Sequence, residues 1–161
     1  MPQLPNLKRL RTIFERRCNM SEESEVLKLE RQLCFPLYTA SRLTTQCYQP
    51  ILQELNLTYP QYLVMLVLWE KNNLSLSDIA QKLFLQSNTL TPLLKRMEEL
   101  GLLTRTRSKQ DERSICISLT ETGEKLKTQA EQVPSKLMQQ ISLTRDEAIQ
   151  LHTLLYKLIQ G

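Results

Sequence analysis

Apolar residues recur at helical spacing near the start of the chain. Between about residues 24 and 53 they follow steps of three and four, at Leu29, Leu33, Leu37, Ala40 and Leu43. This spacing predicts an amphipathic helix. Pro36 lies inside the segment and cannot donate a hydrogen bond to the carbonyl of Gln32, so we expect a kink or a late helix start there. Pro50 predicts a break near residue 49.

The middle of the chain has the pattern of a helix-turn-helix. A turn at 56–60 and the strongly apolar run at 61–70 first predict one short buried helix. The S-x-x-D capping motif that starts at Ser75 then begins a helix of about residues 76–84. After a tight turn, a second helix carries a single apolar face and ends at Gly101. Two helices joined this closely are typical of a DNA-reading motif.

Beyond this glycine, apolar and polar positions alternate. Two alternating segments, at about 103–107 and 115–119, flank a polar tip at 108–113. Because successive side chains of a strand point to opposite faces, the alternation predicts a two-stranded hairpin. We interpret this hairpin as the wing of a winged helix.

The remaining segment returns to helical spacing. Thr120 caps a predicted helix of about residues 121–141, which we expect to kink at Pro134, and Thr144 to Glu147 form a capping box for a last helix. The fold class is therefore mainly α with a small β-wing. With 161 residues, 41% hydrophobic and 24% charged, the chain has the composition of one globular domain.

Charge separates the first residues from the rest. Residues 1–19 hold five basic residues and one acidic residue, which accounts for the whole net charge of +4. We expect residues 1–20 to be a leader or flexible tail, with translation starting at Met1 or Met20, and 21–161 to be a single domain. Contact of the leader with DNA phosphates is the less favoured alternative. Any affinity for DNA must come from where the charges of this neutral domain sit.

Several classes of protein are disfavoured by the sequence. It has no run of 18 apolar residues and no secretory signal, so we expect a cytoplasmic protein without membrane association. The four cysteines (Cys18, Cys34, Cys47 and Cys116) lack zinc-site spacing, and His152 is the only histidine. We therefore expect no metal and no other cofactor, and cysteines that remain thiols.

One face of the second helix of the pair suits DNA. Opposite its leucines it presents short hydrogen-bonding groups near its start and cations further along: Ser87, Asn88, Thr89, Thr91, Lys95 and Arg96. For an isolated helix, a merely solvated face is the more ordinary interpretation. The wing changes this balance, because Arg105 and Arg107 add positive charge to a hairpin thin enough for a minor groove. Asp111 is expected to orient an arginine rather than to touch DNA.

Two groups of residues resemble a known family. Residues 89–98, followed by Asp111-Glu112-Arg113, closely resemble winged-helix repressors of the multiple antibiotic resistance regulator (MarR) family. Residues 32–35 and 57–63 resemble its organic hydroperoxide resistance regulator branch. The resemblance covers about 27–160. It implies a homodimer that binds a palindromic operator in double-stranded DNA and represses a peroxidase gene.

The resemblance also implies a division of the domain. The first and last helices, within 24–55 and 121–160, would intertwine in the dimer, and residues 60–120 would bind DNA. Arg113 would be the wing-tip arginine in the minor groove.

Cys34 is the candidate sensor. Tyr38 lies four residues on, on the same helix face, and a phenol can donate a hydrogen bond to a thiolate. Tyr48 shares that face but lies roughly 21 Å along the helix, so it cannot reach Cys34 of its own chain. If the first helices pack antiparallel in a dimer, Tyr48 and Tyr59 of one subunit lie near Cys34 of the other. The resemblance gives both tyrosines this cross-subunit role.

These residues predict a redox mechanism. An organic hydroperoxide would act as inducer by oxidising the Cys34 thiolate to a sulfenic acid. Some relatives then form a disulfide with a cysteine in the C-terminal helices, but this chain has no cysteine after Cys116. Capture by a small thiol, or further oxidation, is the expected fate of the sulfenate.

Three other functions stay open at this point. A regulator of the same fold could be released by a small aromatic ligand in the dimer crevice, with Cys34 only lining it. A thiol peroxidase is disfavoured because no resolving cysteine or catalytic cluster accompanies Cys34. A pure protein-interaction module is disfavoured by the wing arginines. The sequence therefore predicts a non-enzymatic, redox-sensing DNA-binding repressor.

Overall fold

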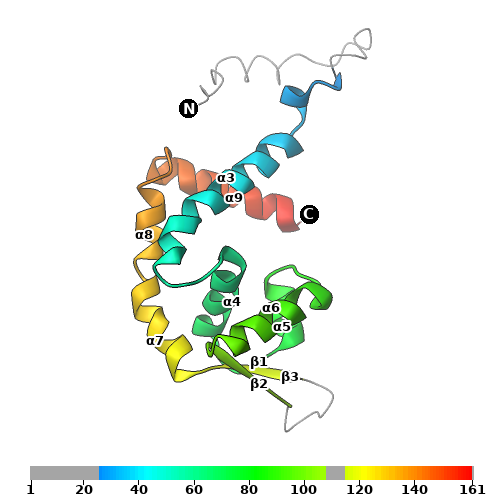
Figure 1. Ribbon diagram of the computed structural model, residues 1–161. Coiled ribbons are helices and arrows are strands. Elements are labelled where there is room, and N and C mark those ends of the chain that lie inside the picture. The colour runs from blue at the N-terminus through cyan, green and yellow to red at the C-terminus, as the bar shows by residue number, and fades with distance from the viewer. Residues whose placement is uncertain (1–25, 108–114, 161) are drawn as a thin grey trace. The chain divides into compact units, whose positions relative to one another are not determined.

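The computed structural model describes residues 26–107 and 115–160 (Figure 1). The predicted leader, residues 1–20, lies outside them. The chain divides into two compact units, residues 1–44 and 45–161, and each is described by itself. The first unit holds a 3-10 helix, Leu29–Arg31, and the first residues of helix α3 (Cys34–Gln53). All other elements belong to the second unit.

Helix α3 begins at Cys34, which confirms the late start that Pro36 predicted. Upstream residues do not continue the helix because Pro36 cannot close the bond to the carbonyl of Gln32, so the start expected near residue 24 is wrong. Within α3, Pro36 lies in the first turn, where backbone N–H groups have no intrahelical partner, and its missing N–H therefore costs nothing.

The break predicted at Pro50 is also wrong, because α3 continues to Gln53. Pro50 leaves the carbonyl of Gln46 without its helical partner, but both residues are exposed, so water can take that bond. Ile51 and Leu52, which follow the proline, are buried in the core. Their burial holds the last turn in place, and tertiary packing overrides the local preference.

Helix α4 (Tyr59–Glu70) starts two residues earlier than expected. Thr58 and Gln61 form a capping box, in which the backbone N–H of Thr58 donates to the Gln61 side chain at 2.8 Å. Pro60 fits in the first turn for the reason that applies to Pro36. The preceding turn is closed by Asn56, whose φ of 54° is in the left-handed region.

Helices α5 (Leu76–Lys82) and α6 (Ser87–Glu99) confirm the predicted helix-turn-helix. Ser75 caps α5 by accepting a hydrogen bond from the backbone N–H of Asp78 at 3.1 Å. Gly101 adopts a φ of 72° just after α6, which is the conformation that a helix C-terminal glycine supplies without strain. Phe84, in the turn between the helices, has a φ of 53°.

The wing belongs to a three-stranded antiparallel sheet with strand order β1-β3-β2. Strands β2 (Leu103–Arg107) and β3 (Ile115–Leu119) confirm the predicted hairpin, and their register buries Leu103 and Ile117. Strand β1 (Leu74–Ser75) pairs with β3 but was not predicted, because two residues are too short to show an alternation. The wing tip, residues 108–114, lies outside the described residues.

The helix expected over 121–141 is divided in two, α7 (Glu121–Ala130) and α8 (Val133–Met138). The division precedes Pro134, which cannot donate to the carbonyl of Ala130 and instead occupies the first turn of α8. The last helix, α9 (Arg145–Gln160), has the predicted capping box, with the Thr144 hydroxyl 2.8 Å from Glu147 Oε2. No described helix is long and apolar enough to cross a membrane.

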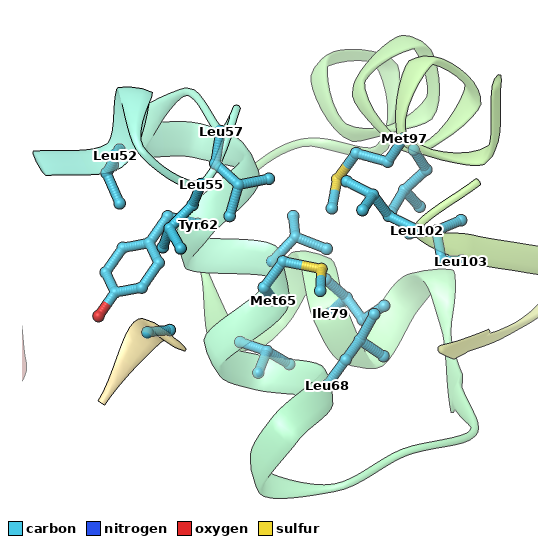
Figure 2. Packing of buried hydrophobic residues seen from close by; sticks show 14 of the residues in the cluster. Leu52, Leu55, Leu57, Tyr62, Met65, Leu68, Ile79, Met97, Leu102 and Leu103 are labelled. Atoms are coloured by element: carbon cyan, nitrogen blue, oxygen red, sulfur yellow. The ribbon is translucent and has the colours of Figure 1, made fainter. Parts of the chain in front are cut away.

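One hydrophobic core joins the end of α3, helices α4 to α8 and the sheet in the second unit (Figure 2), and it contains no residue of α9. Met65 and Leu68 of α4 lie at its centre, beside Ile79 of α5 and Met97 of α6. The end of α3 joins the same core through Leu52, and α8 joins it from the C-terminal side through its own apolar residues, Val133 and Leu137. The core therefore holds the wing and α6, which we call the recognition helix, on one support.

Candidate DNA-binding surface and cysteine site

Helix α6 presents a polar face to solvent because its apolar face is fixed in the core. Leu90, Leu94 and Met97 have no exposed surface. All six predicted DNA-reading residues of this helix are exposed: Ser87, Asn88, Thr89, Thr91, Lys95 and Arg96. The structure therefore brings these six together on one free face, as recognition through a major groove requires.

The start of α6 is open to an anion. No described side chain caps this end, and the first backbone N–H that finds a carbonyl partner there is that of Thr89, which donates to Gln86 at 3.0 Å. The N–H groups of Ser87 and Asn88 precede it and have no helical partner. Unpaired N–H groups at a helix start are suited to a phosphate oxygen.

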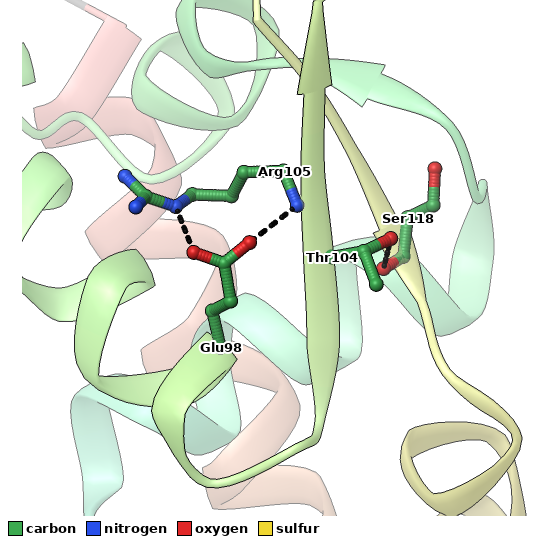
Figure 3. Close-up of polar contacts among 4 residues, drawn as sticks. All are labelled: Glu98, Thr104, Arg105 and Ser118. Carbon is green, nitrogen blue, oxygen red and sulfur yellow. Dashed lines mark hydrogen bonds and ion pairs between the residues drawn. The ribbon is translucent and has the colours of Figure 1, made fainter.

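The two described wing arginines differ in their surroundings. Arg107 is exposed, whereas Arg105 is half-buried against Glu98 of α6 (Figure 3). The Glu98 carboxylate accepts from the Arg105 backbone N–H and from its Nε, both at 2.9 Å, and these bonds hold the pKa of Glu98 below its usual value. Asp111 and Arg113 lie outside the described residues, and contact of any of these side chains with DNA stays a prediction.

Two adjacent asparagines between α4 and β1, Asn72 and Asn73, anchor the wing. Asn72 Oδ1 accepts from the backbone N–H of Leu119 at 2.9 Å, and Asn73 Oδ1 accepts from the hydroxyl of Ser118 at 2.6 Å. The Asn72 side chain also donates to Glu124 of α7 at 3.3 Å. The pair therefore ties strand β3 to the ends of α4 and α7. The adjacent asparagines could have been noticed in the sequence. Their partners could not have been predicted, because they lie more than forty residues away.

A second anchor connects α4 with the start of α7. The indole Nε1–H of Trp69 donates to the carbonyl oxygen of Gly123 at 3.0 Å. Gly123 is buried, and a Cβ at this position would lie 2.1 Å from the carbonyl oxygen of Leu102. Only glycine fits here. Helix α7, which follows the wing, is thus held in close contact with Leu102, the residue directly before β2.

Cys34 is an exposed free thiol at the first residue of α3. Tyr38 follows one helical turn later and is 61% exposed, with the guanidinium of Arg42 5.6 Å from its ring centre. No described residue donates a hydrogen bond to the Cys34 sulfur. At this end of the helix, the backbone N–H of Phe35 donates to the carbonyl oxygen of Gln32 at 3.3 Å.

Three tyrosines form a cluster in the second unit. The ring of Tyr48 lies 4.7 Å from that of Tyr59 and 5.9 Å from that of Tyr62, centre to centre. Burial, together with the neighbouring Tyr59 and Tyr62, raises the pKa of Tyr48 to about 12. Its hydroxyl therefore stays protonated at neutral pH and can act as a donor. The structure brings together the two predicted tyrosines and adds Tyr62, which was not predicted although it lies one turn after Tyr59 on α4.

A cavity of about 510 Å³ opens beside this cluster. It lies between the last turns of α3 and the start of α4, and its walls carry mainly uncharged polar side chains: Thr45, Gln46, Gln49, Gln53, Asn56, Leu57, Thr58, Tyr59 and Pro60. Tyr59 belongs to both the cavity and the cluster. No described group of histidine, cysteine and carboxylate side chains could hold a metal ion.

The other cysteines differ from Cys34 in exposure. Cys47 and Cys116 are free thiols but partly buried, Cys47 against the core and Cys116 on β3 with its sulfur 4.0 Å from the Ser118 hydroxyl. Cys18 lies outside the described residues. Of the described thiols, only Cys34 is exposed, so it is the most accessible to a bulky oxidant.

Comparison with known proteins gives consistent results. Residues 46–130 match the family described as transcriptional regulator SarA/Rot. The organic hydroperoxide resistance transcriptional regulator of Bacillus subtilis (strain 168) is 47% identical over 141 residues, which are 88% of this chain and 96% of that protein.

Solved structures agree with the sequence match. Reduced AbfR bound to DNA, a protein of Staphylococcus epidermidis, is 38% identical, with a TM-score of 0.73 over 86% of this chain and 94% of that chain. Disulfide-formed AbfR is 37% identical, with a TM-score of 0.59 over 88% and 99%. MarR of E. coli, at 22% identity and a TM-score of 0.66 over 79% and 96%, shares the fold.

Proposed function

Because this chain belongs to the SarA/MarR-type winged-helix transcriptional regulators, we propose that it represses transcription and leaves its operator when an organic hydroperoxide oxidises Cys34. The matched relatives are regulators, which confirms the prediction of a regulator rather than an enzyme. The observation that carries the proposal is the exposed thiol at the first residue of α3, in a chain 47% identical to a hydroperoxide resistance regulator.

The proposed chemistry is a two-electron oxidation of sulfur. The Cys34 thiolate attacks the terminal oxygen of the hydroperoxide, the O–O bond breaks, and the alkoxide leaves and takes a proton to become an alcohol. Cys34 becomes a sulfenic acid. A small thiol can then form a mixed disulfide with Cys34, which releases water. The relative AbfR has been solved in reduced, overoxidised and disulfide forms, which supports a redox input for this kind of regulator.

A homodimer is the proposed active form. Helix α9 has no buried residue in the single chain, although it carries a series of large apolar side chains: Ile149, Leu151, Leu154, Tyr156, Leu158 and Ile159. An exposed apolar surface of this extent is expected to be covered by protein. A second copy, paired about a two-fold axis, would cover it and would place two recognition helices on a palindromic operator.

In the proposed dimer, the sensor site is made of residues from both subunits. We place Tyr48 and Tyr59 of one subunit beside Cys34 of the other, where their protonated hydroxyls donate to the sulfur. Tyr38 acts from the same chain as Cys34. Oxidation adds an oxygen atom at this shared position, and this change can alter the spacing of the two copies of α6 in the dimer.

A mobility-shift assay with reduced protein tests the proposal. Cumene hydroperoxide should release DNA from the wild type and from the control variant Cys116→Ser, and should leave Cys34→Ser bound. Release of Cys34→Ser at the same peroxide concentration would remove Cys34 from the mechanism.

The cavity beside Tyr59 supports a second candidate function, release by a small aromatic ligand. Its volume of about 510 Å³ is within the range of pockets that hold such molecules. A phenolic ligand that releases reduced Cys34→Ser protein from DNA would favour this alternative.

A further inference from the structure

One carboxylate holds two groups of the same arginine at the junction of the recognition helix and the wing. Glu98 is in the last turn of α6, and Arg105 is the central residue of β2. Oε1 of Glu98 accepts from the Arg105 backbone N–H and Oε2 from Nε, as Figure 3 shows, with both distances 2.9 Å. A contact that engages both backbone and side chain fixes the position of the strand as well as the direction of the guanidinium.

The backbone bond is possible because β2 is an edge strand. In the order β1-β3-β2, one side of β2 pairs with β3 and the other side has no strand partner. The N–H of Arg105 points to this free side, where Glu98 accepts it. At this residue, a side chain of α6 thus accepts the backbone hydrogen bond that a neighbouring strand would otherwise accept.

The side-chain bond leaves the end of the guanidinium free. Glu98 engages Nε, and no other described acidic side chain forms an ion pair with Arg105. Neither terminal amino group has an acidic partner among the described residues, and the Nε bond fixes the plane in which both lie. A guanidinium held in this way can bind a phosphate oxygen with little further loss of side-chain entropy. Lysine carries a single side-chain nitrogen, so it cannot bond Glu98 through one nitrogen and present two others in a fixed plane.

We propose that Glu98 is a positioning residue for DNA binding, which aims the terminal amino groups of Arg105 at a backbone phosphate and fixes the wing relative to the recognition helix. The inference rests on the DNA-binding part of the proposed function and does not depend on Cys34. A carboxylate beside DNA is repelled by phosphates, so its presence in this surface needs a compensating role. Positioning of Arg105 supplies that role.

The direction in which Glu98→Gln changes DNA affinity distinguishes a positioning role from a simple effect of charge. Glu98→Gln and Glu99→Gln each remove one negative charge from the same end of α6, and exposed Glu99 forms no ion pair with any described residue. Charge alone predicts tighter DNA binding for both variants. Positioning predicts that Glu99→Gln binds at least as tightly as the wild type, whereas Glu98→Gln loses roughly tenfold, the size of one charge-assisted phosphate contact.

The measurement uses reduced full-length protein and a duplex that the wild type selects from a random library. Affinity is measured over a series of salt concentrations by fluorescence anisotropy. Glu98→Gln, Arg105→Ala and the double variant should show the same loss, and the salt slope should fall by about one. Arg105→Lys should not restore binding. Thermal melting of each variant checks that the fold is retained.

The outcomes distinguish this inference from the redox proposal. If Glu98→Gln binds as tightly as Glu99→Gln, or if its loss adds fully to that of Arg105→Ala, the positioning role is overturned while repression stands. Wild-type protein that binds DNA but is not released by peroxide overturns the redox proposal alone. Hydrogen exchange at the Arg105 amide gives a DNA-free readout, because Glu98→Ala should accelerate exchange there, and an unchanged rate would count against the contact.

Discussion

The indole of Trp69 and the carbonyl of Gly123 are joined by a 3.0 Å hydrogen bond that links α4 to the first turn of α7. The contact requires that α7 pass close to the strand leading into the wing, and a glycine makes this approach possible. Helix α7, which follows the wing, is therefore connected rigidly to the core that supports α6 and the wing. Such a connection can transmit a movement of α7 to the DNA-binding elements.

Replacement of Gly123 by alanine should destabilise the protein. The new Cβ would lie 2.1 Å from the Leu102 carbonyl oxygen, so the backbone must move. We expect the free energy of unfolding to fall by about 1–3 kcal/mol in chemical denaturation. Gly101→Ala is the control, since its Cβ meets nothing within 4 Å and only the left-handed backbone is strained, at about 1 kcal/mol. Equal losses at the two sites would contradict the close approach.

Phe84 should be replaceable with a gain in stability. It adopts a φ of 53° while its side chain is 78% exposed, so the ring contributes little packing and the backbone is strained. Phe84→Asn should raise the free energy of unfolding by about 0.5–1 kcal/mol, because asparagine tolerates this conformation. Phe84→Ala removes the same ring but keeps the strain, and it should show no gain. A loss of stability in the asparagine variant would show that the exposed ring is stabilising.

The tyrosine cluster should make stability depend on alkaline pH. Folding raises the pKa of Tyr48 to about 12 from a value near 10 in the unfolded chain, so the folded state holds its proton more tightly. The stabilisation is complete below about pH 10 and is lost as the pH rises towards 12. Tyr48→Phe should therefore lose less stability between pH 9 and 11 in urea titrations than the control, Tyr156→Phe. Parallel pH profiles for the two variants would contradict the burial of the Tyr48 hydroxyl.

Oxidation should be selective among the thiols. After limited treatment with cumene hydroperoxide and a small thiol, mass spectrometry of peptides should find the mixed disulfide at Cys34, and far less at half-buried Cys47 and Cys116. Without the small thiol, sulfinic acid should accumulate at Cys34. Modification that begins at Cys116 would shift the redox input from α3 to the wing.

The wing tip is tested by Arg113→Ala. If Arg113 enters the minor groove, the variant should bind more weakly, by about 1–3 kcal/mol, and with a smaller salt dependence. Unchanged affinity of Arg113→Ala over several salt concentrations would count against the wing-tip role.

Local signals predicted much of this fold. The capping motifs at Ser75 and Thr144 and the C-terminal glycine at Gly101 are each formed by residues a few positions apart, so the sequence itself contains both partners. The alternation of apolar and polar residues at 103–107 and 115–119 likewise predicted the wing, because a period of two residues indicates a strand.

Features that depend on distant residues were not predictable in the same way. Pro50 signals a helix end, but burial of the following Ile51 and Leu52 keeps α3 intact. Strand β1 exists only because β3, more than forty residues later, lies beside it. The hydrogen bonds of Glu98 and Asn72 were likewise not predictable, because no sequence motif links either residue to its partner.

The free side of β2 has one more consequence, for how the protein behaves at high concentration. An edge strand with open N–H groups is a template on which another chain can add a strand, and such pairing leads to aggregation. Glu98 occupies the N–H of Arg105 at the centre of that edge and sets a charged pair beside it. The same carboxylate that aims an arginine in one molecule thus keeps the wings of neighbouring molecules from joining into a continuous sheet.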